Sequence, residues 1–144
     1  MAHWDTSALL KLFFSEKDSS IFSDIAAEGS APVTAFIARH ELHAAFVRRE
    51  SEGALPKGES SRLYSDFMGD LTSGDICETP FSVELEAEFA KVLRQCLFHV
   101  PPLFVRTNDA LHLASARLAG ELEFVSADIR QRDCATHLGF KALP

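Results

Sequence analysis

Four acidic residues occupy positions at which a carboxylate can do chemistry: Asp5, Glu41, Asp109 and Asp128. Two of them end strand-like stretches, one opens a helical pattern, and Glu41 lies inside the apolar arc of another helical pattern. Like charges gathered at one site raise one another's pKa, so four such carboxylates need a cation to stay ionised together. Oxygen ligands select a hard ion, which can orient phosphate and generate hydroxide from water. The set therefore predicts a Mg2+ or Mn2+ site.

Two of these acids have an alternative explanation. Asp5 is followed by Thr6 and Ser7, and all three residue types cap helices by accepting bonds from free backbone N–H groups. One capping residue is enough for such a turn, so one of the three residues is free for another role. Ligands bind at the carboxyl end of a central strand in an open α/β sheet, so Asp5 is also a site candidate. Glu41 could instead form a salt bridge with a nearby arginine. A carboxylate on a buried face is costly unless it is paired or bound to metal, which separates Glu41 from surface acids.

Strand-like and helical stretches alternate along the whole chain. Short strands are predicted around Trp4 and at residues 32–34, 75–79, 123–126 and 140–143. Helices are predicted at residues 8–14, 18–29, 35–52, 59–71, 82–99, 107–119 and 129–138. Such alternation indicates a parallel sheet covered by helices on both faces. We therefore expect one domain over residues 1–144, folded as a three-layer α/β/α sandwich with a mainly parallel sheet.

The helical patterns also predict the surroundings of individual side chains. The helix at residues 82–99 places Glu88 on its solvated face. Thr107 or Asn108 can cap the next helix, which leaves Asp109 free in its first turn. His112 on that helix is expected to serve packing rather than to act as a catalytic base.

Composition and charge exclude several classes of protein. The 144 residues are 47% hydrophobic and 24% charged, which is typical of a globular domain. No apolar run approaches the roughly 20 residues of a membrane span, and no signal peptide is evident, so we expect a cytoplasmic protein. Three scattered cysteines argue against a disulfide framework or a zinc site. The net charge of −7 would become −3 with two bound divalent ions, so it does not exclude a nucleic-acid partner.

Four segments in order resemble the PIN-domain nucleases, and among them the VapC-type ribonuclease toxins of bacterial toxin–antitoxin pairs. The segments are Trp4-Asp5-Thr6-Ser7-Ala8-Leu9-Leu10-Lys11-Leu12, Arg39-His40-Glu41-Leu42, Asn108-Asp109-Ala110-Leu111-His112-Leu113-Ala114-Ser115-Ala116 and Phe124-Val125-Ser126-Ala127-Asp128. The resemblance implies RNA phosphodiester hydrolysis at a pocket that holds magnesium or manganese. The acids of that pocket would be Asp5, Glu41, Asp109 and Asp128, with Thr6 or Ser7 helping to hold water or metal.

The sequence departs from this family at a few positions. Ser126 stands where a threonine is frequent, and Asp133 offers a second acid near Asp128. Asp133 falls inside a predicted helix, so Asp128 is preferred. Several arginines flank the predicted pocket in sequence and are candidates for phosphate contacts, although each alone is more typical of a solvated surface: Arg106, Arg130 and Arg132.

The resemblance further implies a homodimer that is inhibited by an antitoxin protein. Phenylalanines of the first three helices could form an open groove for such a partner, or could be ordinary core: Phe13, Phe14, Phe22 and Phe46. Other functions stay open. These are a degenerate PIN-fold binding module without catalysis, a free-standing RNA-processing nuclease, and a phosphohydrolase of small compounds, for which no Gly-rich phosphate loop is present.

Overall fold

Five short strands form a parallel sheet in the order β3-β2-β1-β4-β5 in the computed structural model, which describes residues 1–144. The strands are β1 (Ala2–Trp4), β2 (Val33–Ala35), β3 (Cys77–Thr79), β4 (Glu123–Val125) and β5 (Lys141–Leu143). The chain runs from β1 outward to β3 and then continues on the other side of β1 with β4. The strand order therefore reverses between β1 and β4, where Trp4 is in register with Val125.

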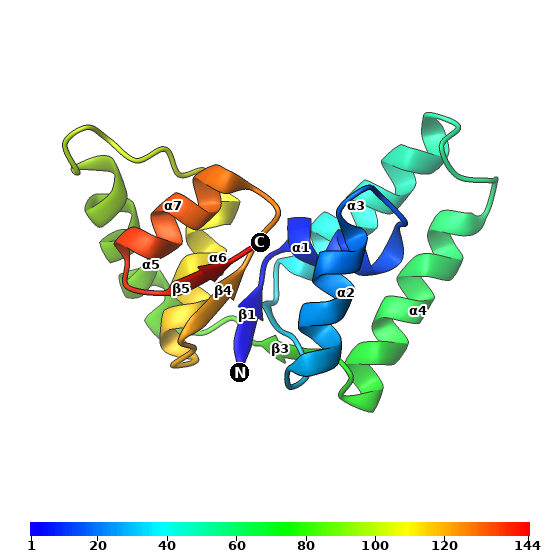
Figure 1. The fold of residues 1–144 in the computed structure, drawn as a ribbon, viewed down its shortest axis with the longest axis horizontal. Helices are drawn as coiled ribbons and strands as arrows, with labels where there is room; N and C mark the ends of the chain where they lie inside the picture. Colours follow the sequence, from blue (N-terminus) through cyan, green and yellow to red (C-terminus); the bar gives the residue numbers. More distant parts are fainter.

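Seven helices cover the sheet (Figure 1): α1 (Thr6–Phe13), α2 (Ser19–Glu28), α3 (Ala38–Ser51), α4 (Glu59–Ser73), α5 (Val83–Leu97), α6 (Thr107–Leu118) and α7 (Ile129–His137). Helices α1 to α4 lie on one side of the sheet and α5 to α7 on the other (Figure 1). This arrangement confirms the predicted α/β/α sandwich with a parallel sheet. None of the helices has the length and apolar character needed to cross a membrane.

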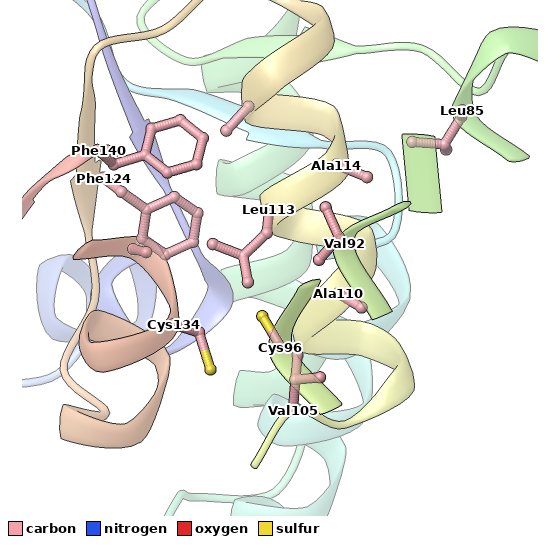
Figure 2. Close-up of a cluster of buried hydrophobic side chains, with 12 residues drawn as sticks. Leu85, Val92, Cys96, Val105, Ala110, Leu113, Ala114, Phe124, Cys134 and Phe140 are labelled. Atoms are coloured by element: carbon pink, nitrogen blue, oxygen red, sulfur yellow. The ribbon is translucent and has the colours of Figure 1, made fainter. Parts of the chain in front are cut away.

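The α5–α7 face of the sheet encloses one apolar core. Figure 2 shows Leu113 of α6 among Phe124 of β4, Phe140 and Val92 of α5. Small residues such as Ala114 let α6 pack close to its neighbours, and Leu113 and Ala114 are fully buried. The ring of His3 in β1 faces this side too, stacked on Phe124 with ring centroids 5.2 Å apart.

The opposite face encloses a second core around Trp4 and corrects the proposed phenylalanine groove. Phe22 and Phe46 are buried in this core. The rings of Phe13 and Phe14 pack edge-on against Phe46 at centroid distances of 5.3 and 5.7 Å. Phe22 and Phe46 are therefore ordinary core, and the prediction that they line an open groove is wrong for these two, whereas Phe13 and Phe14 are partly buried against that core.

Two further expectations need correction. Helix α3 begins at Ala38 rather than at residue 35, because the extended backbone of β2 continues to Ala35. Glu88 is not on a solvated face: it is only 9% exposed, and Arg117 of α6 lies 2.9 Å from its carboxylate. Helix α6 packs along α5, so an arginine 29 positions later supplies the partner that a single helix pattern cannot show.

Candidate functional site

The four predicted acids line a single cavity at the carboxyl edge of the sheet. This acidic cavity has a volume of about 660 Å³, and Asp5, Glu41, Asp109 and Asp128 all contribute to its wall. Asp5 follows β1 and Asp128 comes shortly after β4, the two strands between which the strand order reverses. Crevices at such a reversal are the ligand sites of open α/β sheets. The structure thus brings together residues up to 123 positions apart in the chain.

Asp5 both caps a helix and faces the cavity. Its Oδ1 accepts bonds from the backbone N–H of Ala8 at 2.9 Å and from Ser7 Oγ at 2.7 Å, which caps α1. Its Oδ2 accepts a bond from Ser126 Oγ at 2.5 Å. Burial raises the pKa of Asp5 above its ordinary value, although nearby His112 and the bonds from Ser126, Ser7 and Ala8 oppose this. The fold therefore holds this carboxyl group in one orientation, at an energetic cost when it is ionised.

Glu41, in the first turn of α3, is held by three side chains from two other helices. Its Oε1 accepts from Thr6 Oγ1 at 2.8 Å and from His112 Nε2 at 2.8 Å, while its Oε2 accepts from Asn108 Nδ2 at 3.3 Å. Burial raises the pKa of Glu41, but these bonds outweigh it and hold the pKa below the ordinary glutamate value. Glu41 forms no salt bridge to an arginine, which was the alternative considered for it.

Asp109 and Asp128 meet at the guanidinium group of Arg106. Arg106 Nε donates to Asp109 Oδ2 at 3.0 Å, and Arg106 Nη2 lies 3.7 Å from Asp128 Oδ2. Asp109 also accepts from the backbone N–H of Arg106, so Arg106 rather than Thr107 or Asn108 is the N-cap of α6. The expectation that Asp109 is free in the first turn is therefore wrong.

Asp128 is itself the N-cap of α7, accepting from the backbone N–H of Arg130 at 2.9 Å. Burial raises the pKa of Asp128, but this bond and the side chains of Arg130 and Arg106 outweigh it, so the pKa lies below its ordinary value. Asp133 is exposed on α7 and is not part of the cavity wall. The position of Asp128 supports its choice over Asp133.

The donor chemistry of the cavity fits a hard divalent cation. Carboxylate oxygens are the ligands that Mg2+ and Mn2+ prefer, and four carboxylates line one wall. No three acidic, histidine or cysteine side chains converge closely enough to enclose an ion. Arg106 instead places one positive charge between Asp109 and Asp128, where its guanidinium group takes the place that a metal ion would have between two carboxylates.

Several polar residues of the site were missed or underrated from sequence. His112, expected only to pack, contacts Glu41 directly; its spacing of three residues from Asp109 on one helix was the available signal. Ser126 fixes Asp5, and Ser7 accepts from the backbone N–H of Ala127 at 2.9 Å. Of the flanking arginines, only Arg106 is in the cavity wall, which His40 and Arg48 of α3 also line.

The comparisons with known proteins agree with this architecture. The sequence matches the family model of the PIN domain over residues 4–136. Among solved structures, VapC20 from Mycobacterium tuberculosis, a Sarcin-Ricin loop cleaving toxin, is 15% identical, with a TM-score of 0.72 over 100% of both chains. FitAcB from Neisseria gonorrhoeae is 14% identical, with a TM-score of 0.69 over 100% of this chain and 97% of that chain.

VapBC2 from Rickettsia felis, solved with a DNA fragment from its promoter, is 15% identical, with a TM-score of 0.68 over 100% of both chains. A search of curated proteins by sequence finds no significant match. Identities this low establish a shared fold, whereas the family match covers nearly the whole sequence. The chain belongs to the PIN domain family.

Proposed function

We propose that residues 1–144 form one nuclease domain that hydrolyses RNA phosphodiester bonds with a bound Mg2+ or Mn2+ ion, as a VapC-type toxin. The observation that supports this most is the convergence of Asp5, Glu41, Asp109 and Asp128 on one cavity at the reversal of strand order. Membership of the PIN domain family and the toxin of the same fold from Mycobacterium tuberculosis favour the same function.

The four acids would hold the metal ion, which would supply electrostatic stabilisation for displacement at a phosphate. The protein's own groups prepare this site. Ser126 and Ser7 hold the carboxyl group of Asp5, and Thr6 and His112 hold that of Glu41. Because these bonds already exist in the folded protein, the oxygens need little reorganisation when a ligand enters.

Positive side chains of the cavity are suited to the RNA backbone. Arg48 and Arg106 line the wall beside the acids, and a guanidinium group binds phosphate oxygens with two parallel N–H donors. A chain of net charge −7 offers few other attractions for a polyanion. We therefore assign the phosphate contacts of the substrate to the rim of this cavity.

We also propose that the toxin acts in the cytoplasm as a homodimer and is inhibited by an antitoxin protein. The solved FitAcB and VapBC2 structures of the same fold favour the antitoxin partner. Phe22 and Phe46 are buried in the core, so the antitoxin would have to bind a surface that does not include these two side chains.

One observation favours a second function, a PIN-fold binding module without catalysis. Arg106 pairs with both Asp109 and Asp128, and Arg130 also pairs with Asp128, so the outer two acids already have cationic partners without any added ion. A binding module would keep these ion pairs and have no need of a metal. Metal binding therefore separates the two functions.

Cleavage of a labelled RNA by the purified protein, with Mg2+, with Mn2+ and with excess EDTA, tests the proposal. Asp109→Asn should lower the cleavage rate by more than about 100-fold, because a ligand of the ion is lost, while Asn can still accept the bond from the Arg106 N–H. Asp133→Asn, which removes an exposed acid of α7, is the matched control and should cleave at the native rate. Full cleavage in EDTA or by Asp109→Asn would reject the metal-dependent nuclease.

A further inference from the structure

Two histidines are buried together beneath the acidic cavity. His3 of β1 is fully buried, and His112 of α6 is only 2% exposed. His3 Nε2 lies 3.1 Å from His112 Nδ1, and His112 Nε2 lies 2.8 Å from Glu41 Oε1. The two rings therefore form a hydrogen-bonded chain that leads from the middle of the sheet to a carboxylate in the cavity wall.

The partners fix the direction of each hydrogen bond. Glu41 Oε1 is an acceptor, so the hydrogen must be on His112 Nε2, and in the neutral ring His112 Nδ1 is then an acceptor. His3 must donate to it from Nε2, which leaves His3 Nδ1 without a hydrogen. That atom is indeed buried and without a partner.

The opposite direction would require a hydrogen on His3 Nδ1. This hydrogen would be a donor with no acceptor, in a ring that stacks on Phe124, and a buried unpaired donor is costly. Burial also holds the pKa of His3 well below its ordinary value, consistent with a neutral ring.

We propose that His112 is a positioning residue for Glu41 and that His3 holds His112 in the required tautomer. This inference rests on the proposed function, because it concerns how Glu41 is presented to a metal ion. Thr6 and His112 both bond Oε1, so Oε2, with a single bond of 3.3 Å from Asn108, is the oxygen left for a ligand in the cavity. Without His112 the carboxylate could rotate and lose this orientation, which is the usual role of groups that support metal ligands.

The tautomers can be measured directly on the native, metal-free protein. Two-bond 1H–15N correlation spectra distinguish an imidazole that is protonated on Nε2 from one protonated on Nδ1. The six histidines are assigned by comparison with spectra of His3→Phe and His112→Gln. We expect a hydrogen on Nε2 and none on Nδ1 in both rings. A hydrogen on Nδ1 of either ring would overturn the proposal.

Mn2+ binding measured by calorimetry tests the consequence for the site. His112→Leu should bind Mn2+ about 10–100-fold more weakly than the native protein. His112→Gln can still donate to Glu41 and should bind within a few-fold of native. Native affinity in His112→Leu would overturn the proposal, as would a His112→Gln variant that binds as weakly as His112→Leu.

A parallel titration of Asp109→Asn separates this inference from the proposed function. If Asp109→Asn binds Mn2+ like the native protein, or the native protein binds none, the metal site itself is wrong, and the tautomer spectra alone decide the histidine chain. If Asp109→Asn loses binding and His112→Leu keeps it, the site stands and the positioning role of His112 is wrong. Thermal melting of all variants confirms that the binding differences arise in folded protein.

Discussion

The acidic cavity has two halves that are built differently. The inner pair, Asp5 and Glu41, is held by hydroxyl, amide and imidazole groups. The outer pair, Asp109 and Asp128, is held by backbone N–H groups and by arginine side chains. The inner contacts mostly join distant parts of the chain, such as Ser126 to Asp5 across 121 positions, whereas Arg106 and Arg130 lie two or three residues from the acids they bond.

This difference separates a part of the site that the fold fixes from a part that a ligand can rearrange. The side chains of Arg106 and Arg130 are 59% and 57% exposed, and ion pairs of exposed arginines contribute little to stability. Their guanidinium groups can leave the outer pair without disturbing the fold. Thr6, His112 and Ser126, which hold the inner pair, are buried and cannot.

The largest expected effect concerns the inner pair. Glu41→Gln should lower the RNA cleavage rate by more than about 100-fold, because the amide keeps the bond from His112 but removes the negative charge. Glu50→Gln, near the other end of α3, keeps its acceptor for the Ser60 N–H and should leave the rate unchanged. Steady-state cleavage assays of both variants give the answer. Equal effects of the two substitutions would mean that the inner pair has no special role.

The stability of the metal-free protein should also distinguish the halves. Asp5→Asn should raise the melting temperature at pH 7 by on the order of 3 °C, because its raised pKa means that the ionised form is penalised in the folded state. The pH dependence of this gain follows from proton linkage. The free-energy penalty on the ionised Asp5 is fully present above its folded-state pKa and disappears as the pH falls below the ordinary aspartate pKa. The gain should therefore shrink between pH 7 and about pH 4.

Asp109→Asn is the comparison for this measurement, since it loses the ion pair with Arg106 and should show no such gain. Differential scanning calorimetry in EDTA at several pH values records both melting temperatures. An Asp5→Asn variant that melts lower than the native protein at pH 7 would contradict the view that the ionised Asp5 carboxylate is penalised in the folded protein.

The smallest effect should come from the outer pair. Arg106→Gln should strengthen Mn2+ binding by a few-fold, because one competing charge leaves Asp109 and Asp128, and the gain should fall as salt is added. Arg62→Gln makes the same change in net charge at an equally exposed arginine of α4, which pairs with Glu59 and Asp66. Calorimetric titration at two salt concentrations measures both. Equal gains would show an effect of net charge rather than of the ion pair.

The fold and the positions of the four acids in it could be predicted from the sequence alone. Alternating strands and helices define the layers, and Asp5 and Asp128 could be placed at one edge because the carboxyl ends of parallel strands meet there. Whether the four acids bind a metal stays a prediction. Glu41 was selected because a carboxylate on an apolar helix face needs a partner, and the structure gives it three.

The partners themselves could not be predicted. His3 and His112 are 109 positions apart, and nothing in either local pattern indicates that β1 and α6 place their rings in contact. The burial of Glu88 and of Phe46 likewise depends on which helices pack together, a property of the tertiary structure. Helix periodicity shows which face is apolar but not what covers it.

The adjacency of β1 and β4 has a consequence for the order in which the protein becomes active during its synthesis. Strands β1 to β3 and helices α1 to α4 are encoded first and contain nearly the whole core around Trp4, so this part can begin to assemble while translation continues. Ser126 and Asp128, which orient and complete the acidic cavity, are translated about 120 residues after Asp5. The acidic cavity is therefore incomplete until the ribosome has translated Asp128. If the proposed ribonuclease activity needs all four acids, the nascent chain cannot cut the RNA from which it is being made before that point.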